Sequence, residues 1–341
     1  MKKIILVLFS ILCLLAGFAA WKMFGPATST PHGEFFYIKT GEHYSGVKDS
    51  LVNQRYISSA WWFDKTARLF GFSADRVKAG RYKINKGMSL FQLVRMLKNG
   101  RQTPVNLVIT KLRTKEDFAR KTGSLFECDS MQMMAFLDNP DSLDRYGLDT
   151  NTVMTAILPD TYTYFWNTTP SRIFKKIYEN SQLFWNEERS EKAANHGLTP
   201  AQAYILASIV EEETNDKNDK PLIASVYLNR LSRGMLLQAD PTIKFALRNF
   251  TLKRIYQKYL SVESPYNTYR NKGLPPGPIC TPSRQTIEAV LDSSGTDYLY
   301  FVAKSDLSGK HVFTSNYNDH LKYAKEYQQL LNKLDSSQQE K

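Results

Sequence analysis

The feature that most constrains this chain is an uninterrupted apolar run near its N-terminus. Ile4–Trp21 contains no charged residue, and lysines flank it at Lys2, Lys3 and Lys22. As a helix, at 1.5 Å per residue, the run reaches about 27 Å, which is close to the hydrocarbon thickness of a bilayer. The run therefore predicts a transmembrane helix at residues 4–21.

A cleaved signal peptide is the alternative, because Ala16–Ala20 places small residues near the end of the run. We favour the anchor, since the run is longer than a usual signal core and ends in Trp21, a residue typical of the membrane interface. The lysines lie on the short N-terminal side. The positive-inside rule therefore predicts residues 1–3 in the cytoplasm and about 320 residues outside it.

Charge and cysteine content narrow the class of protein. Lys and Arg number 45 against 33 Asp and Glu, which gives a net charge of +12 and suits an anionic partner such as a membrane surface or an acidic polymer. No nucleic-acid-binding motif is present, so we expect no nucleic acid partner. Cys13, Cys128 and Cys280 allow one disulfide at most. The five histidines have no metal-ligand spacing, and we expect neither a metal nor a cofactor.

The chain then divides into segments of different character. Residues 22–33 are rich in turn residues and predict a tether. Residues 34–104 predict a small strand–helix–helix–strand–helix module, whose last helix is bounded by a serine cap at Ser89 and a glycine stop at Gly100. Residues 332–341 predict a polar tail.

Residues 105–190 predict a connecting part of the larger domain, and one aromatic segment within it stands out. Alternation along Leu158–Trp166 places Tyr162, Tyr164 and Trp166 on one face of a strand. Such rings either stack on sugars in a binding cleft or pack in a core. Both interpretations stay open from the sequence.

The stretch Thr199–Asp240 carries the strongest chemical signal. Thr199 and a following proline predict a helix start, and at 100° per residue one stripe of this helix is apolar except for two members. The stripe consists of Gln202, Leu206, Ile209, Val210 and Glu213. A carboxylate on an apolar face has a raised pKa and can hold a proton near neutral pH, as a general acid must. Glu211 and Glu212 lie outside the stripe. The alternative for Glu213 is that it ends the helix, turns outward and is solvated.

Segments in the same order resemble the endolytic murein transglycosylases of the MltG (YceG-like) family. They include the family's KAGxY, PDTY and ASIxExET patterns and extend over nearly everything after the apolar run. The matching segments are Lys78–Tyr82, Leu158–Tyr162, Ala207–Thr214, Val226–Leu231, Leu237–Thr242, Tyr266–Tyr269, Gly273–Ile279 and Tyr298–Val302. Two positions depart from the family pattern. Ala239 stands where the family usually has threonine, and Thr155–Ile157 stands where the segment before PDTY usually contains a glycine.

The resemblance implies an α+β protein of the inner membrane with one transmembrane helix, a LysM-like module at 34–104 and a catalytic YceG-like domain at 191–331 outside the cytoplasm. It implies cleavage of the bond between N-acetylmuramic acid (MurNAc) and N-acetylglucosamine (GlcNAc) in nascent glycan strands, which ends strand growth and leaves 1,6-anhydro ends. Peptidoglycan strands are the implied substrate, and peptidoglycan synthases are candidate partners. The family's catalytic glutamate matches Glu213, the residue that the helical wheel selects.

Five further residues are candidates for orienting sugar and acid, although each also suits a structural role. They are Glu211, Gln238, Asp240, Asn267 and Tyr269. Two other functions stay open. In a hydrolytic muramidase, Asp240 or Glu211 would be the partner carboxylate. A non-catalytic scaffold would bind peptidoglycan through the module and the aromatic strand.

Overall fold

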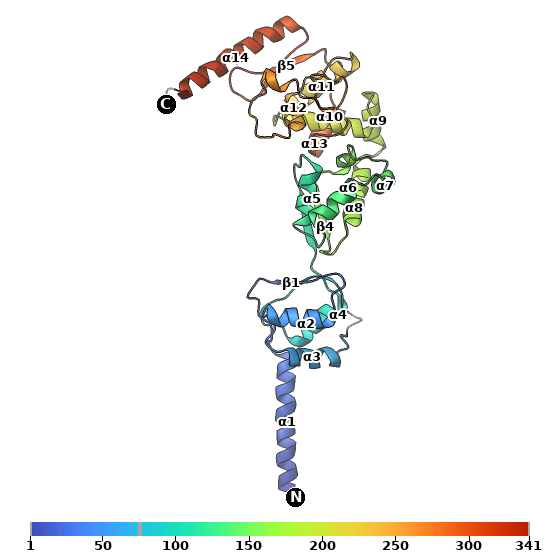
Figure 1. Ribbon diagram of the computed structural model, residues 1–341, viewed down its shortest axis with the longest axis vertical. Helices are drawn as coiled ribbons and strands as arrows, with labels where there is room; N and C mark the ends of the chain where they lie inside the picture. Colours follow the sequence, from blue (N-terminus) through green and yellow to red (C-terminus); the bar gives the residue numbers. More distant parts are fainter. Residues whose placement is uncertain (1, 74–76, 340–341) are drawn as a thin grey trace. The chain divides into compact units, whose positions relative to one another are not determined.

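The computed structural model describes residues 2–73 and 77–339, as a mixed α+β chain (Figure 1). Contacts group the chain into two compact units. The first comprises residues 1–107, 122–129 and 163–169, and the second comprises 108–121, 130–162 and 170–341. The mixed α+β class agrees with the prediction. The domain boundaries at 104 and 190 stay predictions.

The first helix, α1 (Lys2–Phe24), is long and apolar enough to cross a membrane. Its most apolar window has a mean hydropathy of 2.7, and none of that window is buried. The helix continues three residues beyond the predicted end at Trp21. Its C-terminal end contacts the module that follows: Phe18 lies edge-on to Trp62 at 6.0 Å, and Phe24 lies 5.3 Å from the ring of Phe91.

The module has the element order that the sequence predicts. It consists of β1 (Phe35–Ile38), α2 (Tyr44–Asn53), α3 (Ala60–Leu69), β2 (Gly80–Lys83) and α4 (Leu90–Asn99). The two strands pair antiparallel and turn Phe36 and Tyr82 into the core. A reciprocal capping box between Ser89 and Gln92 begins α4, and Gly100 ends it in the left-handed conformation that glycine tolerates (φ 66°).

The predicted tether at 22–33 is in part bound to the module. Residues 22–24 belong to α1. The Thr28 hydroxyl donates to the Asn85 carbonyl at 2.8 Å, and Thr28 also forms a β-bridge with Ile57. Turn-rich composition alone did not reveal these partners, because they come from loops distant in sequence.

The next part of the chain is mainly helical. Its elements are β3 (Val105–Ile109), α5 (Lys115–Gly123), α6 (Ser130–Leu137), α7 (Pro140–Asp144), η2 (Val153–Ala156), β4 (Asp160–Tyr164) and α8 (Pro170–Phe184). Strand β4 pairs with β3. Tyr162 and Tyr164, the predicted alternating rings on β4, are buried. Their burial settles the open choice for these two rings in favour of packing, since a buried ring has no free face for a sugar.

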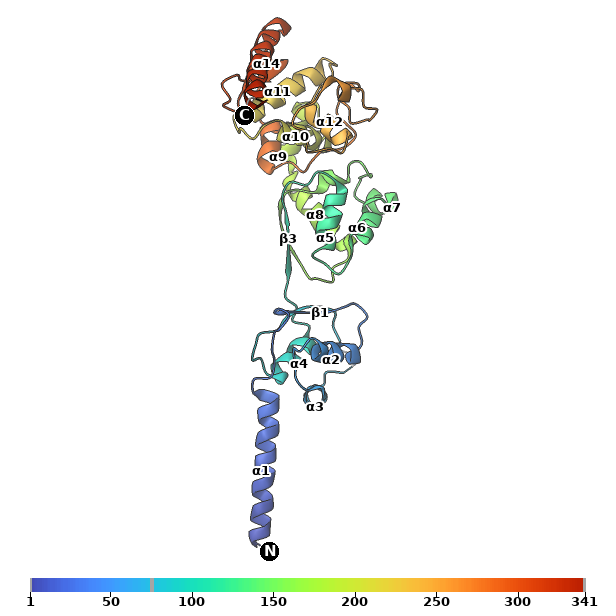
Figure 2. The ribbon, with the colours of Figure 1, turned by 60° about the vertical axis from the view of Figure 1, so that its left-hand side comes forward.

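The remaining elements include α10 and the helices packed against it, of which α9, α11 and α12 are labelled near α10 in Figure 2. They are α9 (Glu187–Asn195), α10 (Pro200–Glu213), α11 (Asp219–Ser232), α12 (Asp240–Ala246), η3 (Gln257–Tyr259), α13 (Arg284–Leu291), β5 (Tyr300–Ala303), β6 (His311–Thr314) and α14 (Tyr317–Gln339). A Thr199–Gln202 capping box starts α10, and every residue from Ala203 to Val210 is buried. Helices α9, α11, α12 and α13 all contact it. Helix α14 continues into the predicted polar tail.

Candidate active site

Glu213 is the last residue of α10 and lies at a polar cavity of about 620 Å³. The residues lining it are Lys111, Arg113, Glu211, Glu212, Glu213, Thr214, Asn215, Asp216, Ser308 and Gly309. The side chain of Glu213 is half-buried, because α10 ends where the packed core gives way to this cavity. A carboxylate placed in this way can meet a ligand without being fully solvated.

The hydroxyl of Tyr227 holds one oxygen of Glu213. Tyr227 lies on α11, is almost completely buried, and donates to Glu213 Oε1 at 2.5 Å. Burial raises the pKa of Glu213 to about 7. The hydrogen bond from Tyr227 and the charge of Lys244 oppose this rise, and Asp240 and Glu212 add to it. Near neutral pH, Glu213 can therefore both hold a proton and release it.

Asp240 and Tyr269 form a hydrogen-bonded pair whose electrostatic influence reaches Glu213, although neither residue lines the cavity at Glu213. Asp240 begins α12, and Tyr269 donates from its hydroxyl to Asp240 Oδ1 at 2.5 Å. Burial raises the pKa of Asp240, while the hydrogen bond from Tyr269 lowers it. The negative charge of Asp240 also contributes to the raised pKa of Glu213.

Gln238 has a backbone conformation that residues other than glycine seldom adopt. Its φ is 54°, in the left-handed region. The backbone N–H of Gln238 donates to the Thr268 carbonyl oxygen at 3.1 Å, and this hydrogen bond holds the conformation. The Gln238 side chain is exposed and makes no hydrogen bond within the part of the chain that the structure describes. The amide group of the Gln238 side chain is therefore available to a ligand.

Glu211 and Asn267 have their polar atoms engaged within the protein. The Glu211 carboxylate accepts hydrogen bonds from Lys220 at 2.9 Å, Ser283 at 3.1 Å and Thr286. Asn267 is completely buried, and its side chain bonds only within its own loop, where it accepts from the Tyr269 amide at 3.0 Å. Asn267 therefore supports the loop that carries Tyr269 and leaves no surface for a sugar.

Three residues at this site carry no functional signal in the sequence as read above: Lys111, Arg113 and Tyr227. Lys111 and Arg113, just after β3, form ion pairs with the two oxygens of Glu212 at 3.1 Å each. Nothing in the sequence connects residues about one hundred positions apart. Tyr227 has no assigned role in the matching segment Val226–Leu231, although a buried tyrosine hydroxyl usually finds a partner, and that was a signal for its bond to Glu213. Among the described residues, no group of three or more His, Cys, Asp or Glu could hold a metal ion.

These features define a class of protein: a mixed α+β chain in which one carboxyl group with a raised pKa lies at a polar cavity. The model of the YceG-like family matches residues 36–326. A Bacillus subtilis (strain 168) protein named endolytic murein transglycosylase is 30% identical over 306 residues, which cover 85% of this chain and 83% of that protein. The chain belongs to the YceG-like family.

Two further comparisons agree with this membership. A Streptococcus pneumoniae (strain R6) protein, also named endolytic murein transglycosylase, is 30% identical over 284 residues, and this chain spans about half of its length (49%). The crystal structure of a yceG-like protein from Listeria monocytogenes superposes with a TM-score of 0.58 at 27% identity. The match covers 84% of this chain and 97% of that one.

Proposed function

We propose that this chain is a membrane-anchored lytic transglycosylase of peptidoglycan, which cleaves the MurNAc–GlcNAc bond within glycan strands and leaves 1,6-anhydro-MurNAc ends. Relatives bearing the name endolytic murein transglycosylase support the general reaction. The observation that carries the mechanism is the Glu213 carboxyl group, held by Tyr227 at the edge of a polar cavity.

In the first step Glu213 is the acid. Because Tyr227 donates to Oε1, the carboxyl proton of Glu213 belongs on Oε2, the oxygen that meets the substrate in this mechanism. That proton passes to the glycosidic oxygen as its bond to the anomeric carbon breaks through an oxocarbenium-like state. The Tyr227 hydrogen bond and the charge of Lys244 both favour the carboxylate that this step leaves behind.

In the second step the Glu213 carboxylate is the base. It takes the proton of the muramic 6-hydroxyl, whose oxygen attacks the anomeric carbon and closes the 1,6-anhydro ring. The proton given in the first step is thereby recovered, and no water is consumed. A pKa near 7 suits both directions of transfer, since neither protonation state is strongly disfavoured at neutral pH.

The contacts of α1 support a retained anchor over a cleaved signal. Phe18 and Phe24 both pack against rings of the module, so cleavage within Ala16–Ala20 would separate Phe18 from Trp62. We propose that the module is LysM-like and faces the same side of the membrane as Glu213. A mature protein whose N-terminus, by Edman sequencing, begins after Ala20 would overturn the anchor.

Mass spectrometry of the products tests the reaction. Uncrosslinked glycan strands incubated with the full-length protein in detergent are expected to yield internal fragments ending in 1,6-anhydro-MurNAc. Reducing MurNAc ends would instead indicate a hydrolase, with Asp240 as the neighbouring carboxylate. Binding of strands without any fragments would indicate a scaffold.

The pH dependence of cleavage reports the protonation of Glu213. Because the first step requires the acid form, kcat/KM is expected to fall about tenfold per pH unit above pH 7. Tyr227→Phe removes a donor that favours the carboxylate, so the pKa of Glu213 rises. The alkaline limb of kcat/KM should then move to higher pH, measured by release of soluble fragments.

Tyr269→Phe is the matched control for this shift. It removes the same hydroxyl group from a tyrosine that bonds Asp240 and not Glu213. The loss of this donor raises the pKa of Asp240 and so cannot raise that of Glu213, which means that the alkaline limb of this variant should not move to higher pH. A limb that moves equally in both variants, or in neither, would contradict the assignment of Tyr227 as the donor to Glu213.

A further inference from the structure

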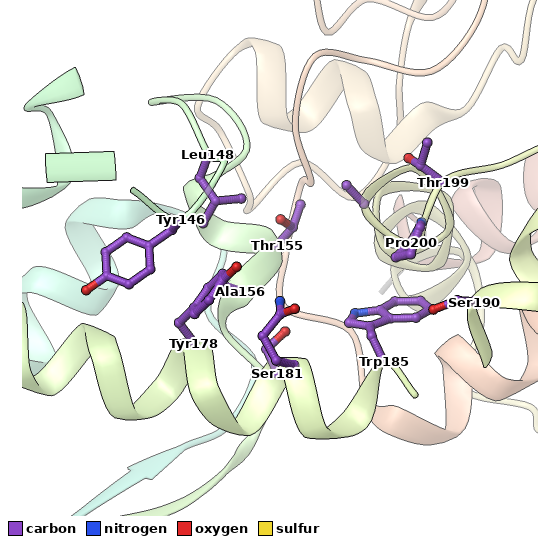
Figure 3. Close-up of a pocket in the computed structure, with 12 residues that line it drawn as sticks. Tyr146, Leu148, Thr155, Ala156, Tyr178, Ser181, Trp185, Ser190, Thr199 and Pro200 are labelled. Atoms are coloured by element: carbon purple, nitrogen blue, oxygen red, sulfur yellow. The ribbon is translucent and has the colours of Figure 1, made fainter. Parts of the chain in front are cut away.

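A second cavity, of about 300 Å³, lies at the opposite end of α10 from Glu213 (Figure 3). Thr199 and Pro200, where α10 begins, form one wall, and Thr155 and Ala156 of η2 form another. At 1.5 Å per residue, the start of α10 lies about 20 Å from Glu213. The cavity is therefore separate from the proposed cleavage site.

One face of α8 and the residue after it form the floor of this cavity. Tyr178, Ser181, Gln182 and Trp185 are spaced so that they share one side of a helix. In Figure 3 the indole nitrogen of Trp185 points toward the middle of the cavity, and Tyr178 and Ser181 rise from the same helix. Tyr146 packs on Tyr178 with ring centroids 4.8 Å apart. These three aromatic rings are half-buried, so part of each can meet a ligand.

The cavity is polar without being charged. None of the twelve described residues that line it is an Asp, Glu, Lys, Arg or His. The side chains of Gln182, Trp185 and Ser190 make no hydrogen bond within residues 2–73 and 77–339, so their polar groups are free to bind a ligand, whereas Ser181 is buried. Indole and amide N–H groups donate, and hydroxyl and amide oxygens accept.

We propose that this cavity binds one N-acetylhexosamine residue of a glycan strand, as a saccharide subsite remote from the cleavage point. Aromatic rings stack on the apolar faces of a pyranose, and the Gln182 amide has the donor and acceptor that an acetamido group requires. An anionic peptide or phosphate would find no cation here. That the residue belongs to peptidoglycan rests on the proposed function.

The position of the subsite has a consequence for substrate choice. A strand that occupies both this cavity and the Glu213 site must span at least about 20 Å, and so must contain several sugars. Short fragments can occupy only one of the two sites. Binding energy gained at the remote cavity lowers KM for long strands without changing the chemistry at Glu213.

The test measures binding of the β-1,4-linked GlcNAc tetramer to the full-length protein in detergent, by titration calorimetry. Gln182→Ala is the main variant, because Gln182 is exposed and its loss leaves the fold intact; Trp185→Ala is the second. Each should weaken binding at this site about tenfold, which corresponds to one hydrogen bond or stacking contact. Leu183→Ala is the matched control, since Leu183 is 80% exposed on the same helix and does not line the cavity.

The cleavage assay gives the second readout. Gln182→Ala should raise KM for long strands while kcat, and KM for short fragments, stay unchanged. Unaltered tetramer affinity and unaltered KM in Gln182→Ala would overturn the subsite. Tetramer binding that depends on Gln182 in a protein with no cleavage activity would leave the subsite intact and overturn the proposed function instead.

Discussion

Replacing Glu213 with glutamine is expected to reduce cleavage of glycan strands about a thousandfold. Glutamine keeps the size and hydrogen-bonding atoms of the side chain, but it has no proton to give to the glycosidic oxygen. Positioned proton transfer contributes about a hundredfold to ten-thousandfold in enzymes, and here one group performs it twice. The measurement is the initial rate of anhydro-ended fragment release from purified strands at pH 6.

A stability measurement separates this loss from unfolding. The pKa of Glu213 in the folded protein, about 7, lies above the usual value for a glutamate, so the stability that this group contributes is complete at low pH and is lost as pH rises through about 7. Glu213→Gln has no charge to bury, and at pH 8 it should unfold at the same or a higher temperature than the unaltered protein.

Glu188→Gln is the matched substitution for the activity assay, because Glu188 lies exposed on α9. It should cleave strands at the unaltered rate. Full activity in Glu213→Gln, or an equal loss in Glu188→Gln, would contradict the role given to Glu213.

The sequence predicted those features that depend on local spacing. The start of α10 followed from the local signals at Thr199 and Pro200. The helical wheel did not separate Glu213 from its neighbours, because α10 is buried on all sides from Ala203 to Val210 and Glu211 and Glu212 line the same cavity. The order of elements in the small module followed in the same way from short-range signals such as the Ser89 cap. Such signals involve residues three to seven positions apart, so they can be recognised from the sequence alone.

Features that depend on tertiary contacts could not be predicted from the sequence. The ion pairs of Glu212 with Lys111 and Arg113 join residues about a hundred positions apart. Aromatic density drew attention to Tyr162 and Tyr164, which are buried. Of the rings that line the second cavity, Tyr178 on α8 and Trp185 just after it share one side of the helix, but Tyr146 comes from the loop between α7 and η2 and meets them only in the folded chain.

A large loss of stability is expected when Lys220 is replaced. Its ammonium group lies 2.9 Å from Glu211 Oε2, and the two side chains are nearly buried, at 9% and 13% exposure. Lys220→Met should lower the free energy of unfolding by about 3–5 kcal/mol, because it leaves a buried carboxylate without its cation. Urea denaturation of the purified protein at pH 7 measures this change.

The pH dependence of this loss follows from the pKa of Glu211. Burial pushes that pKa up, but hydrogen bonds from Thr286 and Lys220 and the charge of Lys220 outweigh it, and the net shift is downward. A lowered pKa contributes stability above the usual pKa of a glutamate, and that contribution is lost as pH falls through the folded value. The stability gap between Lys220→Met and the unaltered protein should therefore narrow in acid.

The double variant Glu211→Gln with Lys220→Met tests whether Glu211 has only a structural role or also binds the glycan. Removing both charges should recover most of the lost stability, since no unpaired charge remains buried. If Glu211 only joins α10 to α11 and α13, the stable double variant should also cleave strands at close to the normal rate. Recovered stability with cleavage still lost would instead give Glu211 a direct role in binding the glycan, since its paired carboxylate lines the same cavity as Glu213.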